Sequence, residues 1–308
     1  MSAIIQDALL LLKVIDIQDA AVPASEYAVA SRSLNRMIQA WSAADLFLWN
    51  KQEATVFLQQ GQNQYTLGAT GNNCTKSYVS TTLTAAAATN ATVLAVTSSA
   101  GMTALDNVGI VLSTGNIFWT TVSVVNSTTQ ITLTAGISSG ASKGAVVYDY
   151  TTGIPARPHL ITSARKMDIN NLEIVISQVR YEEYFEQPFK TSTGKPILYT
   201  YNKQLPNGQL CLWPTPDDMT DVVKISYYEP VEDFSASTDT PDFPKECLDA
   251  LVYGLAVNLG PMFAIATQDL GVLKSLADEK FNLLKSFNSE EASLLMSPNM
   301  RGNARGMR

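Results

Sequence analysis

A long stretch with almost no charge constrains the fold of this chain more than any other feature. Between Tyr78 and Tyr148 the only charged residues are Asp106 and Lys143, and serine, threonine, alanine and valine dominate. Glycine- or asparagine-containing turns separate short β-branched segments, which are ATVLAV, NVGIVL, IFWTTVSVV, TQITLTA and GAVVYDY. Short strands at this spacing are typical of a small sandwich or barrel, and their β-branched and aromatic content argues against disorder. The sequence therefore predicts an inserted all-β lobe with its own core over residues 76–151.

Both ends of the chain show helical periodicity. Apolar residues recur on one face over residues 3–16 and again over 24–43, which predicts a pair of antiparallel helices. Two more helices are predicted towards the C-terminus, one that begins at Pro244 and one over residues 267–288. Isolated helices this short are marginal in water, so their apolar stripes must pack on each other or on something else.

Strand signals fill the chain between the lobe and the C-terminal helices. The candidate strands lie at residues 172–178, 196–202, 209–213 and 222–228. Asn207 and Gly208, in LPNGQL, predict a hairpin turn between the second and the third of these strands. Ahead of the lobe, VFLQQGQNQYTLG predicts another hairpin, with its two short strands on either side of Gly61.

These patterns together predict an α+β fold. A helical base, made of the N-terminal helix pair and the C-terminal helices, carries a small antiparallel β-sheet and the inserted all-β sandwich or barrel lobe. The predicted divisions are a core over residues 1–75 and 152–290, the lobe over 76–151, and a flexible C-terminal tail over 291–308.

Charge and cysteine usage limit the function classes. The chain has 28 acidic against 21 basic residues, a net charge of −7 and no long basic run. Tight nucleic-acid binding requires lysine and arginine to replace counterions along the phosphates, so this composition favours a surface that DNA passes without binding. Cys74, Cys211 and Cys247 form no CxxC pair, which argues against a disulfide framework or a zinc site and is typical of a reducing cytosol. We expect neither a secretion signal nor a membrane span.

No residues are spaced for acid–base or nucleophilic catalysis. His159 is the only histidine, and no nucleophile motif accompanies it. Glu182, Glu183 and Glu186 include the only conceivable carboxylate pair for a glycosidase-like reaction. Three acids on one helical turn are, however, typical of a solvated face.

No residues are spaced for a metal or a cofactor. Asp217, Asp218 and Asp221 lack the glycine and the closing glutamate of an EF-hand loop, so the sequence favours a turn with Asx hydrogen bonds over calcium binding. No glycine-rich phosphate loop follows a strand. The sequence predicts no catalytic residue, no metal and no cofactor, and therefore not an enzyme.

The order of five segments carries more information than any one of them. They are LNRMIQAWSAADLFLWNKQE, VFLQQGQNQYTLG, GKPILYTYN, GQLCLWPTPD and FPKECLDALVYGLAVNLGP. This series resembles the head-to-tail adaptor proteins of tailed bacteriophages, also called connectors or tail accessory factors. The matching residues are Leu34, Asn35, Met37, Trp41, Gly61, Gln62, Tyr65, Leu67, Gly68, Gly194, Pro196, Tyr199, Leu210, Leu212, Trp213, Pro214, Pro216, Leu251, Leu255, Ala256 and Leu259. The resemblance covers residues 1–75 and 152–288, while Lys13 and the residues after Pro261 depart from the family pattern.

The resemblance implies a dodecameric ring at the head–tail junction of a virion, assembled in the host cytoplasm. The ring would sit beneath the portal protein, receive the tail nozzle or other tail proteins, and continue the channel through which double-stranded DNA passes without specific binding. No cofactor and no membrane are implied. We expect the helices over residues 3–43 and 244–288 to make most subunit contacts. The subunit-packing candidates are Leu34, Met37, Trp41, Leu251, Leu255 and Leu259.

The C-terminal tail is predicted to be disordered in the free subunit and to order on a partner, in first place the portal. After Glu291 the chain contains no acid, and the segment holds three arginines and a few apolar residues, too few for a core. The candidate interface residues are Leu294, Met300, Arg301, Arg305 and Arg308.

Two other function classes stay open at this point. One is a peptidoglycan-degrading virion enzyme that uses Glu182 and Glu186. The other is a carbohydrate- or receptor-binding module in which the lobe stacks aromatic rings on sugars, with the candidates Tyr78, Phe118, Trp119 and Tyr148. Period-2 alternation in strands places some of these rings in the core of the lobe instead.

Overall fold

The chain forms two compact units in a computed structural model, which describes residues 2–16, 22–43, 50–231, 234 and 243–287. The helical unit comprises Met1–Leu48 and Asp233–Arg308, and the β unit comprises Trp49–Glu232.

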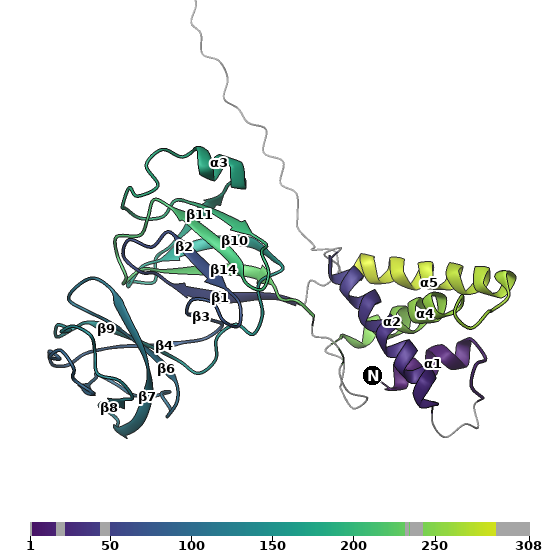
Figure 1. The fold of residues 1–308 in the computed structure, drawn as a ribbon, viewed down its shortest axis with the longest axis horizontal. Coiled ribbons are helices and arrows are strands. Elements are labelled where there is room, and N and C mark those ends of the chain that lie inside the picture. Colours follow the sequence, from purple (N-terminus) through teal and green to yellow (C-terminus); the bar gives the residue numbers. More distant parts are fainter. Residues whose placement is uncertain (1, 17–21, 44–49, 232–233, 235–242, 288–308) are drawn as a thin grey trace, which may run out of the picture. The chain divides into compact units, whose positions relative to one another are not determined.

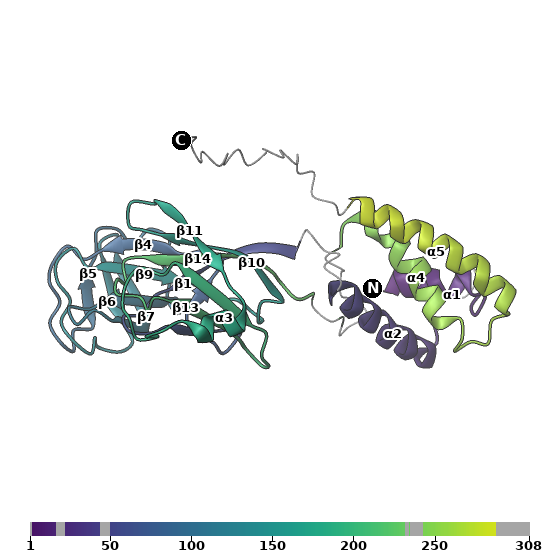
Figure 2. The same cartoon turned by 90° about the horizontal axis from the view of Figure 1, so that it is seen from above.

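In its described residues, the helical unit consists of four α-helices and a short 3-10 turn. They are α1 (Ser2–Leu11), α2 (Ala24–Ala43), η2 (Lys245–Cys247), α4 (Leu248–Leu259) and α5 (Thr267–Phe287). Helix α4 packs against α1, α2 and α5, and it lies between α1 and α5 (Figure 1 and Figure 2). The predicted helix pair and the predicted C-terminal helices are thus confirmed.

Helix α1 ends earlier than its apolar periodicity indicates. Lys13 adopts a φ of 56°, in the left-handed region. The Lys13 N–H bonds to the Leu10 carbonyl at 2.9 Å and the Val14 N–H to the Leu9 carbonyl at 3.0 Å, which is the hydrogen-bond pattern of a Schellman cap. The prediction of a helix as far as residue 16 was therefore wrong, because residues 12–16 continue the apolar pattern beyond the cap.

The eight-stranded sheet of the β unit follows the order β2-β13-β12-β11-β10-β14-β1-β3. Its strands are β1 (Lys51–Phe57), β2 (Gln64–Leu67), β3 (Cys74–Thr75), β10 (Leu160–Met167), β11 (Glu173–Gln178), β12 (Leu198–Asn202), β13 (Gly208–Trp213) and β14 (Val222–Tyr228). Neighbouring strands are antiparallel except β11 and β12, which are parallel. The sheet curls around a core of its inward-facing residues (Figure 1). The prediction of a small, purely antiparallel sheet was therefore wrong in size and in one pairing.

The hairpin predicted around Gly61 does not form. Both strands exist, but β1 pairs with β14 and β3, whereas β2 pairs with β13. Gly61 has a φ of 75° and donates its N–H to the Pro216 carbonyl at 3.1 Å, so the turn directs the chain to the other end of the sheet. The hairpin predicted at Asn207 is confirmed, with Asn202 paired to Gln209.

The predicted lobe forms a six-stranded curled sheet in the order β4-β9-β6-β7-β8-β5. Its strands are β4 (Val79–Thr82), β5 (Val93–Ala95), β6 (Asn107–Val111), β7 (Ile117–Ser127), β8 (Gln130–Leu133) and β9 (Val146–Tyr150). The two edges approach each other: the Thr84 N–H bonds to the Ala95 carbonyl at 2.9 Å, and the Thr97 N–H to the Thr82 carbonyl at 2.8 Å. A separate buried cluster that includes Val108, Val122 and Ile131 fills the lobe.

An aromatic cluster joins the lobe to the eight-stranded sheet. The Phe57 ring of β1 lies 4.9 Å from the Tyr148 ring, 5.0 Å from Trp119 and 5.3 Å from Tyr78, centroid to centroid. Met167, Met219 and Val222 of the sheet side are buried in the same cluster. The Tyr148 hydroxyl donates to the Met219 carbonyl at 3.2 Å. The lobe therefore has a core of its own and a second core that it shares with the eight-stranded sheet.

Candidate interaction surfaces

The acidic candidates for catalysis lie on an exposed helix. Glu182, Glu183 and Glu186 are all exposed on α3 (Tyr181–Glu186). Glu183 caps the helix, because its carboxylate accepts the Arg180 backbone N–H at 3.2 Å. This is the solvated face that three acids on one turn indicate. His159 is half-buried at the start of β10, where its N–H bonds to the Tyr228 carbonyl at 2.8 Å.

The three aspartates near residue 220 do not converge. Asp218 accepts the Thr220 N–H at 2.9 Å and the Thr220 hydroxyl at 2.6 Å, which confirms the predicted Asx turn. Asp217 is exposed, whereas Asp221 is buried and bound to Lys166. Within the described ranges, no three His, Cys, Asp or Glu side chains gather as metal ligands.

The three cysteines are buried and free. Burial raises the pKa of the Cys211 thiol to about 11, and burial together with the Glu246 carboxylate raises that of Cys247 to about 11. The pKa of Cys74 is raised by burial as well. A reactive cysteine needs a lowered pKa and access to solvent, so these thiols act as small core residues.

The aromatic candidates for sugar stacking serve the core. Tyr148 is buried, and Tyr78 and Trp119 are half-buried around Phe57. Phe118 is half-buried against the separate core of the lobe. A sugar-binding platform needs an open ring face. Tyr78, Trp119 and Tyr148 instead pack against Phe57, and Phe118 packs against the core of the lobe.

The predicted subunit-packing residues form the core of the helical unit. Leu34, Leu251, Leu255 and Leu259 are fully buried, and Met37 is nearly so. Trp41 is half-buried, with its ring 5.1 Å from the Phe281 ring of α5. The tail residues Leu294, Met300, Arg301, Arg305 and Arg308 lie outside the described residues.

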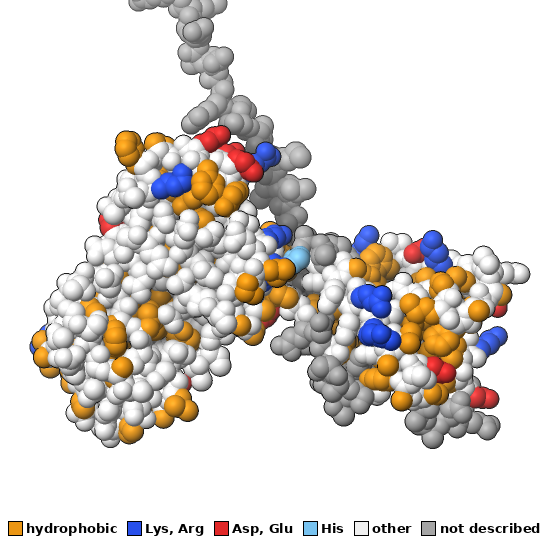
Figure 3. All heavy atoms as spheres, viewed as in Figure 1, with side chains coloured by type: hydrophobic (Ala, Val, Ile, Leu, Met, Phe, Trp, Pro, Cys, Tyr) orange, Lys and Arg blue, Asp and Glu red, His pale blue; other side chains and the backbone are white. Residues whose placement is uncertain are grey.

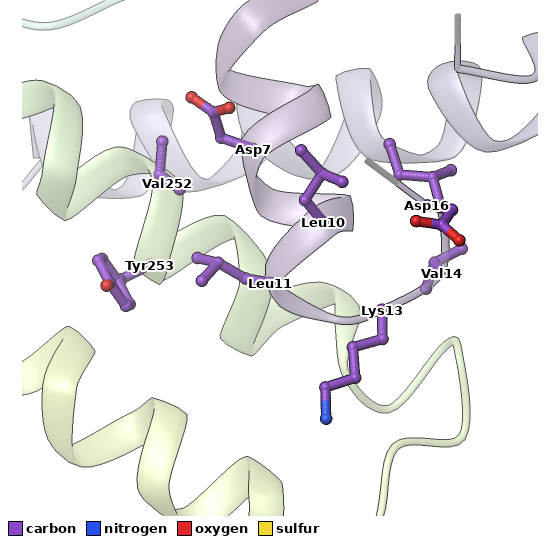
Figure 4. Close-up of a pocket in the computed structure, with 9 residues that line it drawn as sticks. Asp7, Leu10, Leu11, Lys13, Val14, Asp16, Val252 and Tyr253 are labelled. Atoms are coloured by element: carbon purple, nitrogen blue, oxygen red, sulfur yellow. The ribbon is translucent and has the colours of Figure 1, made fainter. Parts of the chain in front are cut away.

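An open groove with a volume of about 930 Å³ runs between α1 and α4 (Figure 4). Its apolar walls come from the end of α1 and from α4, with Leu10, Leu11, Val14, Val252 and Tyr253 all half-buried. Three exposed charged residues, Asp7, Lys13 and Asp16, also line it. The groove follows from the Schellman cap, because the chain turns at Lys13 while α4 continues. Apolar periodicity alone did not reveal it.

A second apolar surface lies on the outer face of α5. Val272, Leu276 and Leu283 are 59%, 37% and 57% exposed. Figure 3 shows apolar side chains gathered on the visible face of the helical unit. The inward face of the same helix is covered, with Ala277 and Leu284 buried. Together with the α1–α4 groove, this stripe gives the described part of the helical unit two exposed apolar surfaces.

The β10–β11 hairpin is a third exposed apolar surface. Ile169, Leu172, Ile174 and Val175 are between 50% and 71% exposed. Strand β12 pairs with β11 only at Ser177 and Gln178. The Ser177 backbone N–H points towards β12. The N–H and carbonyl groups of residues two apart in a strand point to the same side. Those of Val175 therefore face the edge of β11 that β12 does not cover.

Sequence reasoning missed two pairs of buried charged residues in the β unit. Lys166 Nζ lies 3.1 Å from Asp221 Oδ2, and both side chains are 4% exposed. Asp106 and Asp149 are each 1% exposed and adjacent in the lobe. The sequence separation within each pair leaves no local spacing that could have revealed it.

Comparisons with known proteins bear on the role of these surfaces. The family model of the SU10 adaptor protein matches residues 114–300, which is more than half of the chain. This match runs from the lobe through the eight-stranded sheet to the C-terminal helices. No curated protein matches the chain. No helix in the described part of the chain is both long and apolar enough to cross a membrane.

Proposed function

The chain belongs to the SU10 adaptor protein family and is a phage structural adaptor, and from this premise we propose that it forms a ring joining the portal to the tail. The family match is the observation that carries the proposal. In this ring, a dodecamer, the chain binds the portal protein on one side and the tail nozzle or other tail proteins on the other. Its place is the head–tail junction of the virion, after assembly in the host cytoplasm.

The surfaces of the helical unit support a role in assembly. Two apolar surfaces, the α1–α4 groove and the α5 stripe, are exposed in the described part of the helical unit. Contiguous exposed apolar surfaces mark interaction sites in soluble proteins. The buried subunit-packing residues, such as Leu251 and Leu255, contribute by fixing the helices that present these surfaces.

The ring continues the DNA channel in this proposal. The net charge of −7 gives DNA little to bind. An acidic lumen lets the genome slide past without adhering, which an exit channel requires. The proposed role needs no cofactor and no catalytic residue.

The proposed divisions are an adaptor core over residues 1–75 and 152–290, the lobe over 76–151 and a tail over 291–308. The separate core of the lobe supports its independent folding, whereas the cluster around Phe57, which it shares with the eight-stranded sheet, ties it to the rest of the β unit. Replacing 76–151 with a Gly/Ser linker tests this division. A base that keeps its helix and strand content by circular dichroism supports it, and loss of all structure contradicts it.

The C-terminal tail docks on the portal in this proposal, with Leu294 and Met300 as apolar anchors and Arg301, Arg305 and Arg308 as charges. The support is its positive charge in an otherwise acidic chain. Deleting residues 294–308 is expected to weaken attachment to purified portal rings, and high salt is expected to weaken wild-type attachment in the same way. Unchanged attachment of the truncated chain would contradict this role.

Electron microscopy of phage particles tests the function as a whole. A gold-labelled or affinity-tagged chain is expected in a closed ring of symmetry-related copies at the head–tail junction. A particle in which the chain is monomeric, or lies elsewhere in the virion, refutes the proposal.

A further inference from the structure

We propose that residues 100–106 form a pH-sensitive cap on the lobe, a loop that opens by itself when the two carboxyl groups beneath it, Asp106 and Asp149, are both charged. The loop leads directly into β6, and Asp149 lies in β9. The rest of the lobe stays folded when the cap opens. This inference concerns the lobe alone and does not depend on the ring.

The 100–106 loop lies over the sheet face that carries Asp149. Asp149 is directly opposite Val79 of β4, so the two side chains point to the same face. A Cβ atom on Gly101 would lie 3.0 Å from Val79 Cγ2, which places the backbone of the loop against that face. Asp106, at the end of the loop, is hydrogen-bonded to Asp149 when Asp149 carries a proton. The loop therefore covers both carboxyl groups, and each aspartate is 1% exposed.

The loop itself has few buried anchors. Met102 and Asp106 are its buried residues, whereas Leu105 is 81% exposed. Gly101 and Leu105 have φ values of 86° and 75°, in the left-handed region that leucine seldom adopts. The Thr103 N–H and hydroxyl both donate to Asp106 Oδ2, so the loop is held by one of the two carboxyl groups that it covers. A segment with so few buried contacts opens at a lower free-energy cost than the strands beneath it.

Within the described part of the lobe, Asp106 is the ionisable group that faces Asp149. The residues in register with Asp149 on β4 and β6 are valines. The tyrosines of β9 lie on the opposite face of that strand, in the aromatic cluster shared with the eight-stranded sheet. Lys76 and Lys143, the lysines of the lobe, are both exposed. The electrostatic effect on Asp149 therefore comes from Asp106.

Ionisation of Asp149 drives the opening. Burial, and then the charge of Asp106 and a hydrogen bond to it, raises the pKa of Asp149 to about 7. In the open loop the carboxyl group meets water and returns to its ordinary pKa near 4. Below pH 4 Asp149 is protonated in both forms. Between pH 4 and 7 it keeps its proton only in the closed form, so the open fraction rises with pH and levels off above pH 7.

Amide hydrogen exchange in the full chain tests the response to pH. The amides of Met102 and Leu105 donate to backbone carbonyls and report on the loop. Relative to Asp149→Asn, in which the side chain stays neutral, we expect their exchange to accelerate about tenfold for each pH unit from 5 to 7 and no further above 7. The ratio of the two proteins at each pH removes the intrinsic pH dependence of exchange. Asp217→Asn, at an exposed position, is the matched control for a lost charge and is expected to follow the wild type.

Strand amides distinguish a local cap from unfolding of the whole lobe. Ile110 of β6 and Val147 of β9 lie in the separate core of the lobe. At pH 7 we expect the loop amides to have protection factors at least tenfold lower than those of these two residues. Equal protection factors would mean that the lobe opens as one unit, which overturns the inference. Loop exchange that follows the same pH course in the wild type and in Asp149→Asn overturns it as well.

Labelling of a buried thiol provides the second measurement. In Met102→Cys the new thiol lies under the cap, and at pH 7 we expect a maleimide to label it at least tenfold faster than in the same variant with Asp149→Asn. The matched control is Val108→Cys, in the core beneath, which is expected to be labelled much more slowly in both backgrounds. The three native cysteines are buried and common to all variants. Equal labelling of Met102→Cys in the two backgrounds, or equally fast labelling of Val108→Cys, contradicts a cap that opens by itself.

Discussion

The buried carboxyl pair of the lobe makes its stability depend on pH, and Asp149→Asn is expected to abolish most of that dependence. Asp149 lies in β9 and Asp106 immediately before β6, and each is 1% exposed. Asp106 Oδ2 accepts the Thr103 N–H and hydroxyl. The Oδ1 atoms of both aspartates are buried, and within the described residues neither accepts a hydrogen bond from a protein donor. A side-chain hydrogen bond joins the two carboxyl groups when Asp149 carries a proton.

Burial is the first cause that raises the pKa of Asp149, to about 7, and the charge of Asp106 and a hydrogen bond to it add to the shift. The unfolded chain has the ordinary pKa near 4. Below pH 4 Asp149 is protonated in both the folded and the unfolded chain, so its titration does not lower the free energy of unfolding. Between pH 4 and 7 Asp149 keeps its proton only in the folded chain, so the free energy of unfolding falls as pH rises. The total loss is about 4 kcal/mol, from a shift of about three units at 1.4 kcal/mol each.

In Asp149→Asn the side chain is neutral at every pH, and its amide can donate to Asp106 Oδ1. The variant is expected to match the wild type near pH 4 and to exceed its free energy of unfolding by several kcal/mol at pH 8. Urea unfolding at pH 4 to 8, followed by circular dichroism, measures the difference, and other titrating groups cancel because both proteins share them. Asp217→Asn, at an exposed position, controls for the lost charge. Parallel curves for the wild type and Asp149→Asn at all pH values would refute the raised pKa of Asp149 as the cause of the pH dependence.

Three further outcomes follow from burial and exposure in the β unit. Asp221→Asn leaves Lys166 buried without its carboxylate and is expected to cost about 3–5 kcal/mol in urea unfolding; a loss below 1 kcal/mol would contradict it. Phe57→Ala removes the ring at the centre of the aromatic cluster and is expected to cost about 3–5 kcal/mol, whereas Phe189→Ala, at an 83% exposed position, changes stability by about 0.5 kcal/mol at most. Val175→Lys places a charge on the open apolar edge of β11. We expect less concentration-dependent aggregation in light scattering, with an unchanged midpoint of urea unfolding. Equal aggregation of the two proteins would show that this edge is not the site of aggregation.

Sequence periodicity predicts the helices and strands that bury one face and expose the other. The four helices were predicted because their apolar stripes face a common core, and the lobe strands because β-branched runs alternate with turns. Strand β14 was predicted to the residue, since all but two of its side chains are buried. Such patterns depend only on the segment itself, so they can be recognised in a single sequence.

Strand β10 was missed because its polar residues have long-range partners. Its sequence, LITSARKM, places Arg165 and Lys166 next to each other in a central strand. Arg165 forms ion pairs with Glu53 and Glu173 on one face of the sheet, while Lys166 is buried with Asp221 on the other. Neither pairing has a local signature, and alternation of apolar and polar residues fails where both faces hold charges.

Strand pairing was the least predictable property. The turn at Gly61 was correctly located, but a turn signal states where the chain changes direction and not which strands meet afterwards. The candidate surfaces share this limit. The α1–α4 groove depends on a Schellman cap at Lys13, a residue that seldom adopts a positive φ, and on the packing of α4 far along the chain. Sequence periodicity therefore located the helices that line the groove but did not predict the groove itself.

The charge-poor composition of the lobe has a structural explanation that bears on its place in an assembly. Its apolar residues fill a separate core, and its outer surface is covered mainly by hydroxyl side chains. Some of these hydroxyls bond across the sheet, as Thr82 does to Thr97 at 2.9 Å and Thr121 to Thr134 at 2.8 Å, which stabilises the strands without charge. Figure 3 shows the visible face of the lobe with few charged side chains. In the proposed ring, a nearly neutral, hydrogen-bonded lobe surface would neither attract nor repel the acidic neighbouring copies and the DNA, so the lobe adds little electrostatic cost to the assembly.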